Sequence, residues 1–416
     1  MNSTADNSVL IIGAGIIGIS IALELQASGK TVCVLDRTGV AAEASAGNAG
    51  AFAFSDIVPL ATPGIMRKAP KWLLDPLGPL SIPPAYALKI APWMLRFWRA
   101  SWRDRYETSL SAQAQLMKLS RAALEKQVKR VNGEHLLRRE GQLQLYQGER
   151  EFRASLPGWE LRRQHGIRFG LLNSPGAIAE VQPGIDPRFT HAGFTHDWMN
   201  TVDPARWTRH LAQVFVAGGG TIETENIKAL SQDGGHIILT ASTGSRRAST
   251  VVVACGAFSG KLAGTLGDKI PLETERGYNT TLPAGAFDLR THLTFGSHGF
   301  VVTRIWDGIR VGGAVELGGL KLPPNYKRAD ILLQKASRFL QGLNPAGGSQ
   351  WMGFRPSLPD SLPVISRSPK AAGVIYAFGH GHLGLTQSAG TAELVAALVE
   401  GRPAPISLDA IAASRF

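Results

Sequence analysis

The stretch Val9-Leu10-Ile11-Ile12-Gly13-Ala14-Gly15-Ile16-Ile17-Gly18 decides the fold of this 416-residue chain. Its first four residues form a continuous apolar run, which predicts a strand in the middle of a parallel sheet. A helical pattern follows over Ile16–Ala27 and stops before Gly29, and a second apolar strand, Thr31–Leu35, runs into Asp36. Strand, helix and strand in this order form a βαβ unit, so the sequence predicts an α/β fold.

Three glycines and an acidic residue give this unit the pattern of a dinucleotide-binding site. Gly13 permits a sharp turn, Gly15 lets the backbone approach a pyrophosphate, and Gly18 allows the helix to pack closely on the strand. The helix N-terminus offers N–H groups and a positive dipole end to the phosphates. Asp36 can accept bonds from ribose hydroxyls, which excludes NADP but leaves FAD and NAD. The predicted cofactor-binding residues of this unit are Gly13, Gly15, Ile16, Ile17, Gly18, Asp36 and Arg37.

Further motifs resemble the D-amino-acid oxidase family of FAD enzymes. The small residues Ala44–Gly50 are similar to the family's stretch after the second strand, and Val251–Ser259 resembles its second flavin fingerprint. Asn226-Ile227 matches a strand whose backbone contacts adenine. Gly353–Asp360 and Tyr376–Thr386 resemble the closing signature, and are most similar to bacterial D-amino-acid dehydrogenases and D-hydroxyproline dehydrogenases.

This resemblance implies FAD as the cofactor and adds residues to its site. The small-residue stretch passes close to the flavin, and the glycine-rich loop before a helix beginning near Thr386 brings N–H groups and a positive dipole to its pyrimidine end. No Cys or His stands out as a covalent anchor, so we expect non-covalent binding. The additional predicted residues are Ser45, Asn48, Ala49, Gly50, Ile227, Cys255, Gly256, Gly381, His382, Leu383, Gly384, Leu385 and Thr386.

The motifs are scattered along the chain, so the cofactor domain has to be discontinuous. We expect an FAD-binding Rossmann-like domain, of the two-dinucleotide-binding, glutathione-reductase-like type, and a second α+β domain that binds the substrate. The first would comprise residues 1–51, 197–267 and 351–416, and the second residues 52–196 and 268–350.

Arg355 and Tyr278 are the predicted substrate-binding residues, and His382 is predicted to line the active site without acting as a base. A planar, permanently charged guanidinium can bind a carboxylate through two bonds, and by resemblance the Arg of a Gly-x-Arg-Pro block does so in amino-acid oxidases. The alternative for Arg355 is a structural or surface ion pair. Tyr278 can bond the same carboxylate, close the pocket, or only pack. His380 is expected to pack or bond locally, and no metal site is expected.

The predicted reaction requires no general base. If the substrate amine binds neutral, its lone pair expels the α-hydrogen as hydride to flavin N5, and water hydrolyses the resulting imine. The sequence therefore predicts an FAD-dependent dehydrogenase of D-amino acids, with cyclic ones such as D-hydroxyproline as candidates, that passes electrons to a quinone or another acceptor. The alternatives are a glycine- or sarcosine-type oxidase that uses oxygen, and a non-catalytic flavin-binding or NAD-binding subunit of a larger complex.

Composition and charge limit the location and the partners. Residues 86–153 carry 14 Lys and Arg against 7 Asp and Glu, but no recognition motif accompanies the charge, so we expect no nucleic acid. Within 92–105, Trp93, Met94, Phe97, Trp98 and Trp102 share one helical face, which suits either internal packing or a membrane surface. No secretory signal or long apolar span is evident. We therefore expect a cytoplasmic protein, with peripheral contact to the inner face of the cytoplasmic membrane as the alternative.

Overall fold

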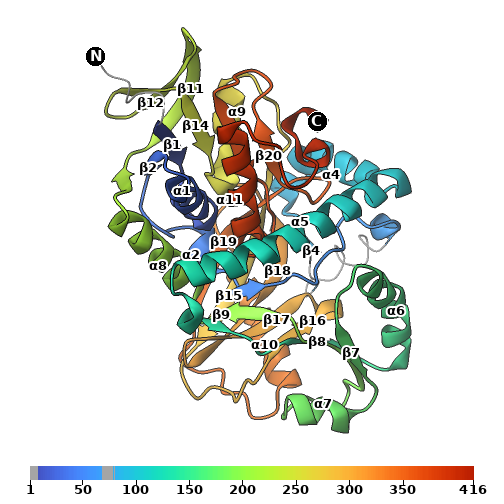
Figure 1. Cartoon of the computed structure of the whole chain (residues 1–416). Coiled ribbons are helices and arrows are strands. Elements are labelled where there is room, and N and C mark those ends of the chain that lie inside the picture. The colour runs from blue at the N-terminus through green and yellow to red at the C-terminus, as the bar shows by residue number, and fades with distance from the viewer. Residues whose placement is uncertain (1–7, 68–77, 79) are drawn as a thin grey trace.

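The computed structural model describes residues 8–67, 78 and 80–416 and contains two large sheets (Figure 1). The first has six strands in the order β10-β2-β1-β14-β21-β20. Neighbouring strands from β10 to β21 are parallel, and β20 runs antiparallel to β21. The strands are β1 (Ser8–Ile12), β2 (Thr31–Asp36), β10 (Thr221–Thr224), β14 (Thr250–Val253), β20 (Val364–Arg367) and β21 (Val374–Phe378).

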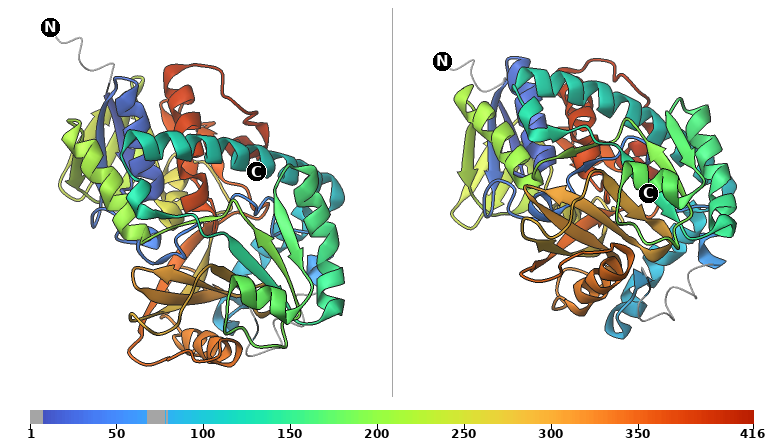
Figure 2. Two further views of the ribbon diagram at one scale, coloured as in Figure 1. Left: turned by 60° about the horizontal axis from the view of Figure 1, so that its bottom comes forward. Right: turned by 90° about the horizontal axis from the view of Figure 1, so that it is seen from below.

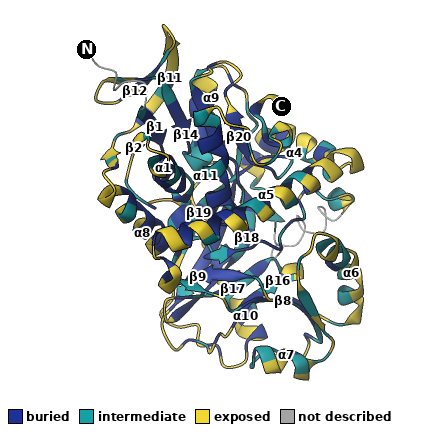
Figure 3. Cartoon of the chain, viewed as in Figure 1, coloured by how far each residue is buried: buried dark blue, intermediate teal, exposed yellow. Residues whose placement is uncertain are grey.

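The predicted βαβ unit is confirmed: helix α1 spans Ile16–Ala27 and the residue after its last turn, Gly29, has a φ of +79°. Helix α11 (Gly384–Glu400) packs beside α1, and the long helix α5 (Arg103–Arg130) crosses α11 in both views of Figure 2. Helix α8 (Pro204–Ala217) covers α1 from another side. Figure 3 shows that α11 is buried over most of its length, because helices and sheet enclose it together.

The second sheet has nine strands in the order β19-β15-β18-β17-β16-β6-β8-β7, with β4 beside β18, and is largely antiparallel. Its apolar core packs against helix α10 (Lys327–Phe339). The strands are β4 (Leu80–Ser81), β6 (Gln142–Tyr146), β7 (Phe169–Leu172), β8 (His191–Thr195), β15 (Glu273–Leu282), β16 (His292–Phe295), β17 (Phe300–Ile305), β18 (Gly308–Leu317) and β19 (Ser349–Ser357).

Shorter elements complete the fold. Two three-stranded sheets have the orders β11-β12-β13 and β3-β9-β5. Their strands are β11 (Ile227–Asp233), β12 (His236–Ala241), β13 (Ser245–Ala248), β3 (Ala51–Phe52), β9 (Met199–Thr201) and β5 (Leu137–Arg138). The other described helices are α2 (Ala44–Gly47), α4 (Ala87–Ala100), α6 (Glu149–Gln164), α7 (Pro175–Val181) and α9 (Ser259–Thr265).

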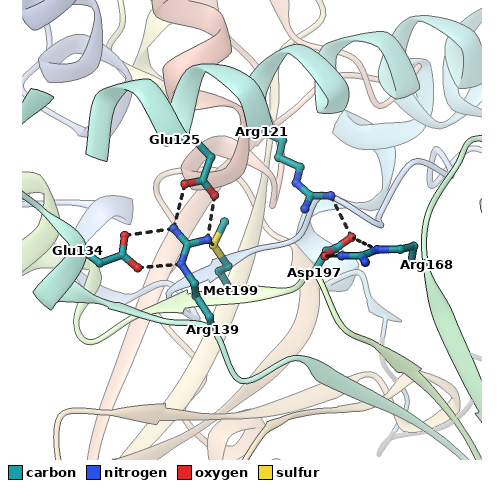
Figure 4. A network of polar contacts seen from close by, with 7 residues as sticks. All are labelled: Arg121, Glu125, Glu134, Arg139, Arg168, Asp197 and Met199. Atoms are coloured by element: carbon teal, nitrogen blue, oxygen red, sulfur yellow. Dashed lines mark hydrogen bonds and ion pairs between the residues drawn. The ribbon is translucent and has the colours of Figure 1, made fainter. Parts of the chain in front are cut away.

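Charged side chains tie α5 to the strands beneath it (Figure 4). Arg139 donates to both oxygens of Glu125 on α5, at 2.8 and 2.9 Å, and to Glu134 at 2.7 and 3.1 Å. Asp197, between β8 and β9, accepts a 3.0 Å bond from Arg121 of the same helix. These contacts fix the helix that covers α11 to strands leading into the second sheet.

The division into two domains stays a prediction, and two segments lie across its boundaries. Residues 351–416 were assigned to the cofactor domain, but β19 is the edge strand of the nine-stranded sheet because it pairs with β15 over its whole length. Helix α5 falls within the range 52–196, yet its buried residues Leu116, Leu124 and Val128 belong to the core around α1 and α11.

The aromatic stretch 92–105 is not one helix. Helix α4 ends at Ala100 and α5 begins at Arg103, because Trp102 is extended with a ψ of 148° and the Ser101 hydroxyl bonds to the Trp98 carbonyl oxygen at 2.7 Å. Trp93 is buried, whereas Trp98 and Trp102 are each 48% exposed. The predicted stripe is therefore divided into a packed part and a solvent-facing part. No helix among the described residues has the length and apolarity needed to span a membrane.

Candidate active site

A cavity of about 860 Å³ is lined by residues of both large sheets. The first sheet contributes the carboxyl ends of β1, β2, β14 and β21, which is where ligands bind in open parallel sheets. The second sheet contributes β15, β18 and β19, and the N-terminus of α11 lies in the wall. One cavity therefore brings together motifs that are more than 300 residues apart in the sequence.

The turn after β1 is shaped by its glycines. Gly13 has a φ of +112°, and a Cβ there would lie 2.4 Å from the Ala254 carbonyl oxygen. A Cβ on Gly18 would lie 1.9 Å from the Gly13 carbonyl oxygen, so Gly18 permits the approach of α1 to the strand and does not face the cavity. Gly15, Ile16 and Ile17 line the cavity at the helix N-terminus. The exposed N–H end of a helix at a glycine turn is suited to a pyrophosphate.

Asp36 is held in place at the tip of β2. Its Oδ1 accepts bonds from the N–H groups of Thr38 and Gly39 at 2.8 and 2.9 Å, and its Oδ2 accepts the Ala14 N–H at 2.8 Å. The carboxylate lines the cavity, and Oδ2 keeps a lone pair for a hydroxyl donor. Arg37 lies beside it, 3.8 Å above the ring of Phe258.

The small-residue stretch 44–50 forms α2 and the turn after it. The Ser45 hydroxyl accepts the Ile16 N–H at 2.9 Å, which ties this stretch to the start of α1. The Asn48 side chain accepts the Gly50 N–H at 2.8 Å, and Ala49 lines the cavity beside it. Gly50 faces Thr201 and not the cavity. The backbone thus passes along the cavity wall without bulky side chains.

The second predicted cofactor block lies against the first. Cys255 and Gly256 follow β14 and line the cavity, as does Ile227 at the start of β11. The Cys255 thiol donates to the Ile12 carbonyl oxygen at 3.1 Å, and burial raises its pKa to about 12. Gly256 has a φ of +53°, which favours glycine at this turn.

The glycine-rich loop before α11 is joined to β19. The Gly381 N–H bonds to the Pro356 carbonyl oxygen at 2.7 Å, so His382 comes to lie near Arg355 at the cavity. The predicted local role of His380 is confirmed: its Nε2 pairs with the Thr391 hydroxyl at 2.9 Å, and burial lowers its pKa to about 3. Burial also lowers the pKa of His382, with a smaller contribution from Arg355.

Helix α11 begins two residues before the predicted start at Thr386. The Gln387 N–H bonds to the Leu383 carbonyl oxygen at 2.9 Å, which closes the first turn at Gly384. Leu383, Gly384 and Leu385 line the cavity. Thr386 does not, because its hydroxyl accepts the Ala53 N–H at 3.0 Å.

Arg355 lies in the cavity wall on β19. Its Nη1 donates to the Ala314 carbonyl oxygen at 2.9 Å, and no ion pair forms to it from the described residues. The guanidinium lies over Gly277, where a Cβ would be 2.3 Å from Nη2. Burial lowers the pKa of Arg355, and Glu275 partly opposes this shift. An unpaired guanidinium with free donors is suited to an anionic ligand.

Comparison with known proteins agrees with this geometry. Residues 8–398 match the model of the DAO family, described as FAD dependent oxidoreductase. A D-amino-acid oxidase of Bradyrhizobium diazoefficiens is 33% identical, covering 98% of each chain, and a D-amino acid dehydrogenase of Sinorhizobium medicae is also 33% identical, covering 98% of this chain and 99% of the relative. The chain belongs to the DAO family.

Solved structures share the fold of this DAO-family chain at lower sequence identity. Glycine oxidase from Geobacillus kaustophilus superposes with a TM-score of 0.78 at 19% identity, covering 98% of each chain. L-proline dehydrogenase from P. horikoshii gives a TM-score of 0.74 at 18% identity, covering 99% of this chain and 97% of the other. The predicted fold class is thereby confirmed, and the protein is an oxidoreductase with FAD as its cofactor.

The residues present fit FAD. The glycine turn is crowded at Gly15, because a Cβ there would lie 3.2 Å from the Ser45 hydroxyl, and its small residues leave the backbone open to a pyrophosphate. Asp36 is suited to accept a bond from a ribose hydroxyl, and it lines the same cavity as His382. The individual contacts of the predicted cofactor residues stay predictions.

Tyr278 is placed differently from the expectation. The residue belongs to the cavity wall, but its hydroxyl bonds to Glu316 at 3.0 Å and accepts the Asn325 N–H at 3.0 Å. The hydroxyl is part of a buried network in which Arg276 also pairs with Glu316, at 3.1 Å. The Tyr278 hydroxyl is therefore already bonded within the protein and is not positioned for a direct bond to a substrate carboxylate. The role of Tyr278 in catalysis stays a prediction.

Sequence reasoning missed several polar residues in the wall of the DAO-family cavity. Glu275 lies opposite Arg355 in the register of β15 and β19, and His292 also lines the cavity, where burial lowers its pKa to about 3. Asn279 donates to the Gly47 carbonyl oxygen at 2.8 Å, and Arg310 donates to the Asn48 carbonyl oxygen at 2.6 Å. Glu275 and Asn279 lie within three residues of the predicted Tyr278, and this closeness in sequence was the signal that could have found them.

Proposed function

We propose that this oxidoreductase dehydrogenates D-amino acids, with cyclic ones such as D-hydroxyproline among its candidate substrates. The observation that carries the proposal is Arg355, a cavity-lining guanidinium without an ion-pair partner among the described residues. The printed names of the relatives, D-amino-acid oxidase and D-amino acid dehydrogenase, support the substrate class. An Arg without an ion-pair partner favours a small carboxylate, because it can form two charge-assisted bonds to it.

The chain's own residues bind and orient the substrate in this proposal. Arg355 binds the carboxylate and fixes the position of the α-carbon. Neutral His382 closes that end of the cavity, and the N-terminus of α11 places N–H groups and a positive dipole end in the wall. Bound FAD would supply the acceptor for the α-hydrogen, which leaves as hydride, and water would hydrolyse the imine product.

We expect the electrons to pass to a quinone or another acceptor. The solvent-facing part of the aromatic stretch supports this, because Leu95, Trp98 and Trp102 are exposed beside Arg96 and would suit a membrane surface that holds the quinone. Loss of vesicle binding in a Trp98→Ser, Trp102→Ser variant is the expected result. Unchanged binding to anionic vesicles would remove this support.

The test of the proposed function is anaerobic bleaching of the bound flavin. A panel of D- and L-amino acids and cyclic imino acids is added to the purified protein, and absorbance near the flavin maximum is followed. D-amino acids should bleach the flavin and L-amino acids should not. Reoxidation by a soluble quinone, and not by oxygen, supports a dehydrogenase, whereas fast reoxidation by oxygen indicates an oxidase. A flavin that no amino acid bleaches would refute the proposal and favour a non-catalytic subunit.

A further inference from the structure

Glu275 is a buried carboxylate in the cavity wall that the proposed reaction has not yet used. It lies on β15, is 6% exposed, and lines the cavity. None of the described residues donates a hydrogen bond to its carboxylate or pairs with it as an ion. A carboxylate in a cavity wall without a protein partner has acceptor capacity left for a ligand.

The neighbouring strand residues do not neutralise it. Side chains alternate along a strand, and Arg276 points to the other face, where it pairs with Glu316 at 3.1 Å. Glu273, two residues earlier, accepts the Tyr86 hydroxyl at 2.9 Å and does not line the cavity. Glu275 is thus distinguished from the nearby acidic residues by having no protein partner.

Arg355 is the residue directly opposite Glu275 in the antiparallel pair of β15 and β19. Directly opposite residues place their Cβ atoms about 5 Å apart on the same face of a sheet. The two charges influence each other, yet they do not come within ion-pair distance, because the Arg355 guanidinium extends over Gly277 to the Ala314 carbonyl oxygen. A positive and a negative group stand side by side in the cavity wall, each with capacity for a ligand.

We infer that Glu275 binds the substrate nitrogen, which arrives protonated, while Arg355 binds its carboxylate. The Glu275 carboxylate then accepts the ammonium proton, so that the nitrogen lone pair is free when the α-hydrogen leaves as hydride. The separated pair complements a zwitterion, whose ammonium and carboxylate are held on neighbouring atoms of one small molecule. His382 interacts electrostatically with Glu275, Arg355 and Asp56, and all four line the cavity. Asp56 already has Arg162 at 3.7 Å and is more exposed, so Glu275 is the carboxylate free for the ligand. This inference rests on the proposed function and makes Glu275 a specificity-determining residue for it.

The test uses two ligands that cannot be oxidised because neither has an α-hydrogen. 2-Aminoisobutyrate carries an ammonium where 2,2-dimethylpropanoate carries a methyl group, and the two are otherwise nearly the same in shape. Their dissociation constants are measured on the FAD-loaded protein from the shift of the flavin absorbance. The wild type should bind the amino acid more tightly. Glu275→Gln should weaken the amino acid about tenfold or more, as expected when one member of a desolvated charge pair is removed, and change the amine-free acid less than about threefold.

Two control variants separate this role from general damage. Glu273→Gln makes the same chemical change two residues away, outside the cavity, and should alter neither dissociation constant. Arg355→Ala should weaken both ligands, because both carry the carboxylate. If Glu275→Gln does not retain FAD, Glu275→Asp keeps the charge on a shorter side chain and should reduce the preference for the amino acid only partly.

The outcomes are distinguishable. Equal loss of both ligands in Glu275→Gln, or a preference for the amino acid that survives in both Glu275 variants, would overturn the inference while leaving the proposed function intact. If the wild type binds neither ligand but is bleached by a D-amino acid, the dissociation constant of that substrate is taken from the concentration dependence of flavin reduction and has to rise in the same way. A wild type that no amino acid bleaches refutes the proposed function instead.

Discussion

The two large sheets meet at one cavity but contribute to it in different ways. The six-stranded sheet presents the ends of parallel strands, and its part of the cavity wall includes the glycine turns at Gly13, Gly15 and Gly256. The nine-stranded sheet contributes the charged side chains of Glu275 and Arg355 to the wall. Backbone contacts suit a cofactor that never changes, whereas side chains can be exchanged without altering the fold.

The largest expected effect tests the backbone role of the first sheet. Gly13→Ala places a Cβ 2.4 Å from the Ala254 carbonyl oxygen at a φ of +112°. Strain and overpacking together should cost about 3 kcal/mol and abolish FAD binding. Flavin content after purification and urea unfolding measure both effects. Gly264→Ala on α9 is the matched control, because a Cβ there meets nothing within 4 Å. Normal flavin content in Gly13→Ala would contradict the assignment.

The pH dependence of stability allows a comparison of two buried histidines, one from each large sheet region. His292 on β16 and His380 after β21 each have a pKa lowered by burial to about 3, against an ordinary value of 6.5. The unfolded chain binds more protons between these values, so stability is complete above about pH 6.5 and falls as the pH drops toward 3. Each histidine should contribute a slope of about 1.4 kcal/mol per pH unit in this window.

Urea unfolding at pH 7, 6 and 5 measures this slope. His292→Asn and His380→Asn should each make it shallower by a similar amount, since both imidazoles are neutral in the fold. A variant whose slope equals that of the wild type would show that its histidine is protonated in the native protein.

A smaller effect, on carboxylate binding alone, is expected from a substitution in the second sheet. Gly277→Ala would place a Cβ 2.3 Å from Nη2 of Arg355, whose long side chain can move aside at little cost in stability. The displaced guanidinium should weaken carboxylate ligands about tenfold, or about 1.4 kcal/mol, with FAD content unchanged. Spectral titration with 2,2-dimethylpropanoate measures this, and loss of FAD in this variant would break the distinction between the two sheets.

The smallest expected effect concerns Cys255, the thiol within the predicted second flavin fingerprint. Burial raises its pKa to about 12, so the nucleophilic thiolate is scarce at neutral pH. Cys255→Ala should retain the wild-type flavin content, and acid precipitation of the wild type should release all FAD into the supernatant. Flavin that stays with the precipitated protein would show a covalent link.

Local patterns made the first region predictable. The unit from β1 to β2 was found with its helix at Ile16–Ala27, because apolar periodicity and glycine signals act between residues close in sequence. Asp36 and Arg355 were also found, since each follows a recognisable motif and lines the cavity.

The second region was harder to predict because its strands pair across long sequence separations. The pairing of β15 with β19 brings Glu275 opposite Arg355, 80 positions apart, and neither segment alone signals it. The same pairing places β19, which lies mostly within the predicted cofactor segment 351–416, in the nine-stranded sheet. Tyr278 was predicted because its hydroxyl can bond a carboxylate, but that hydroxyl bonds to Glu316, a residue of β18 that the sequence did not single out.

The central claim is that the second sheet binds an amino acid through Arg355, and anaerobic reduction of the FAD-loaded Arg355→Ala variant tests it most directly. Flavin content should equal that of the wild type, because Arg355 belongs to the nine-stranded sheet. The apparent dissociation constant of the best D-amino acid should rise about 30-fold or more, which corresponds to about 2 kcal/mol for a charge-assisted bond. Arg338→Ala, an exposed residue on α10, should leave it unchanged. An Arg355→Ala variant that binds and oxidises the amino acid as the wild type does would contradict the claim.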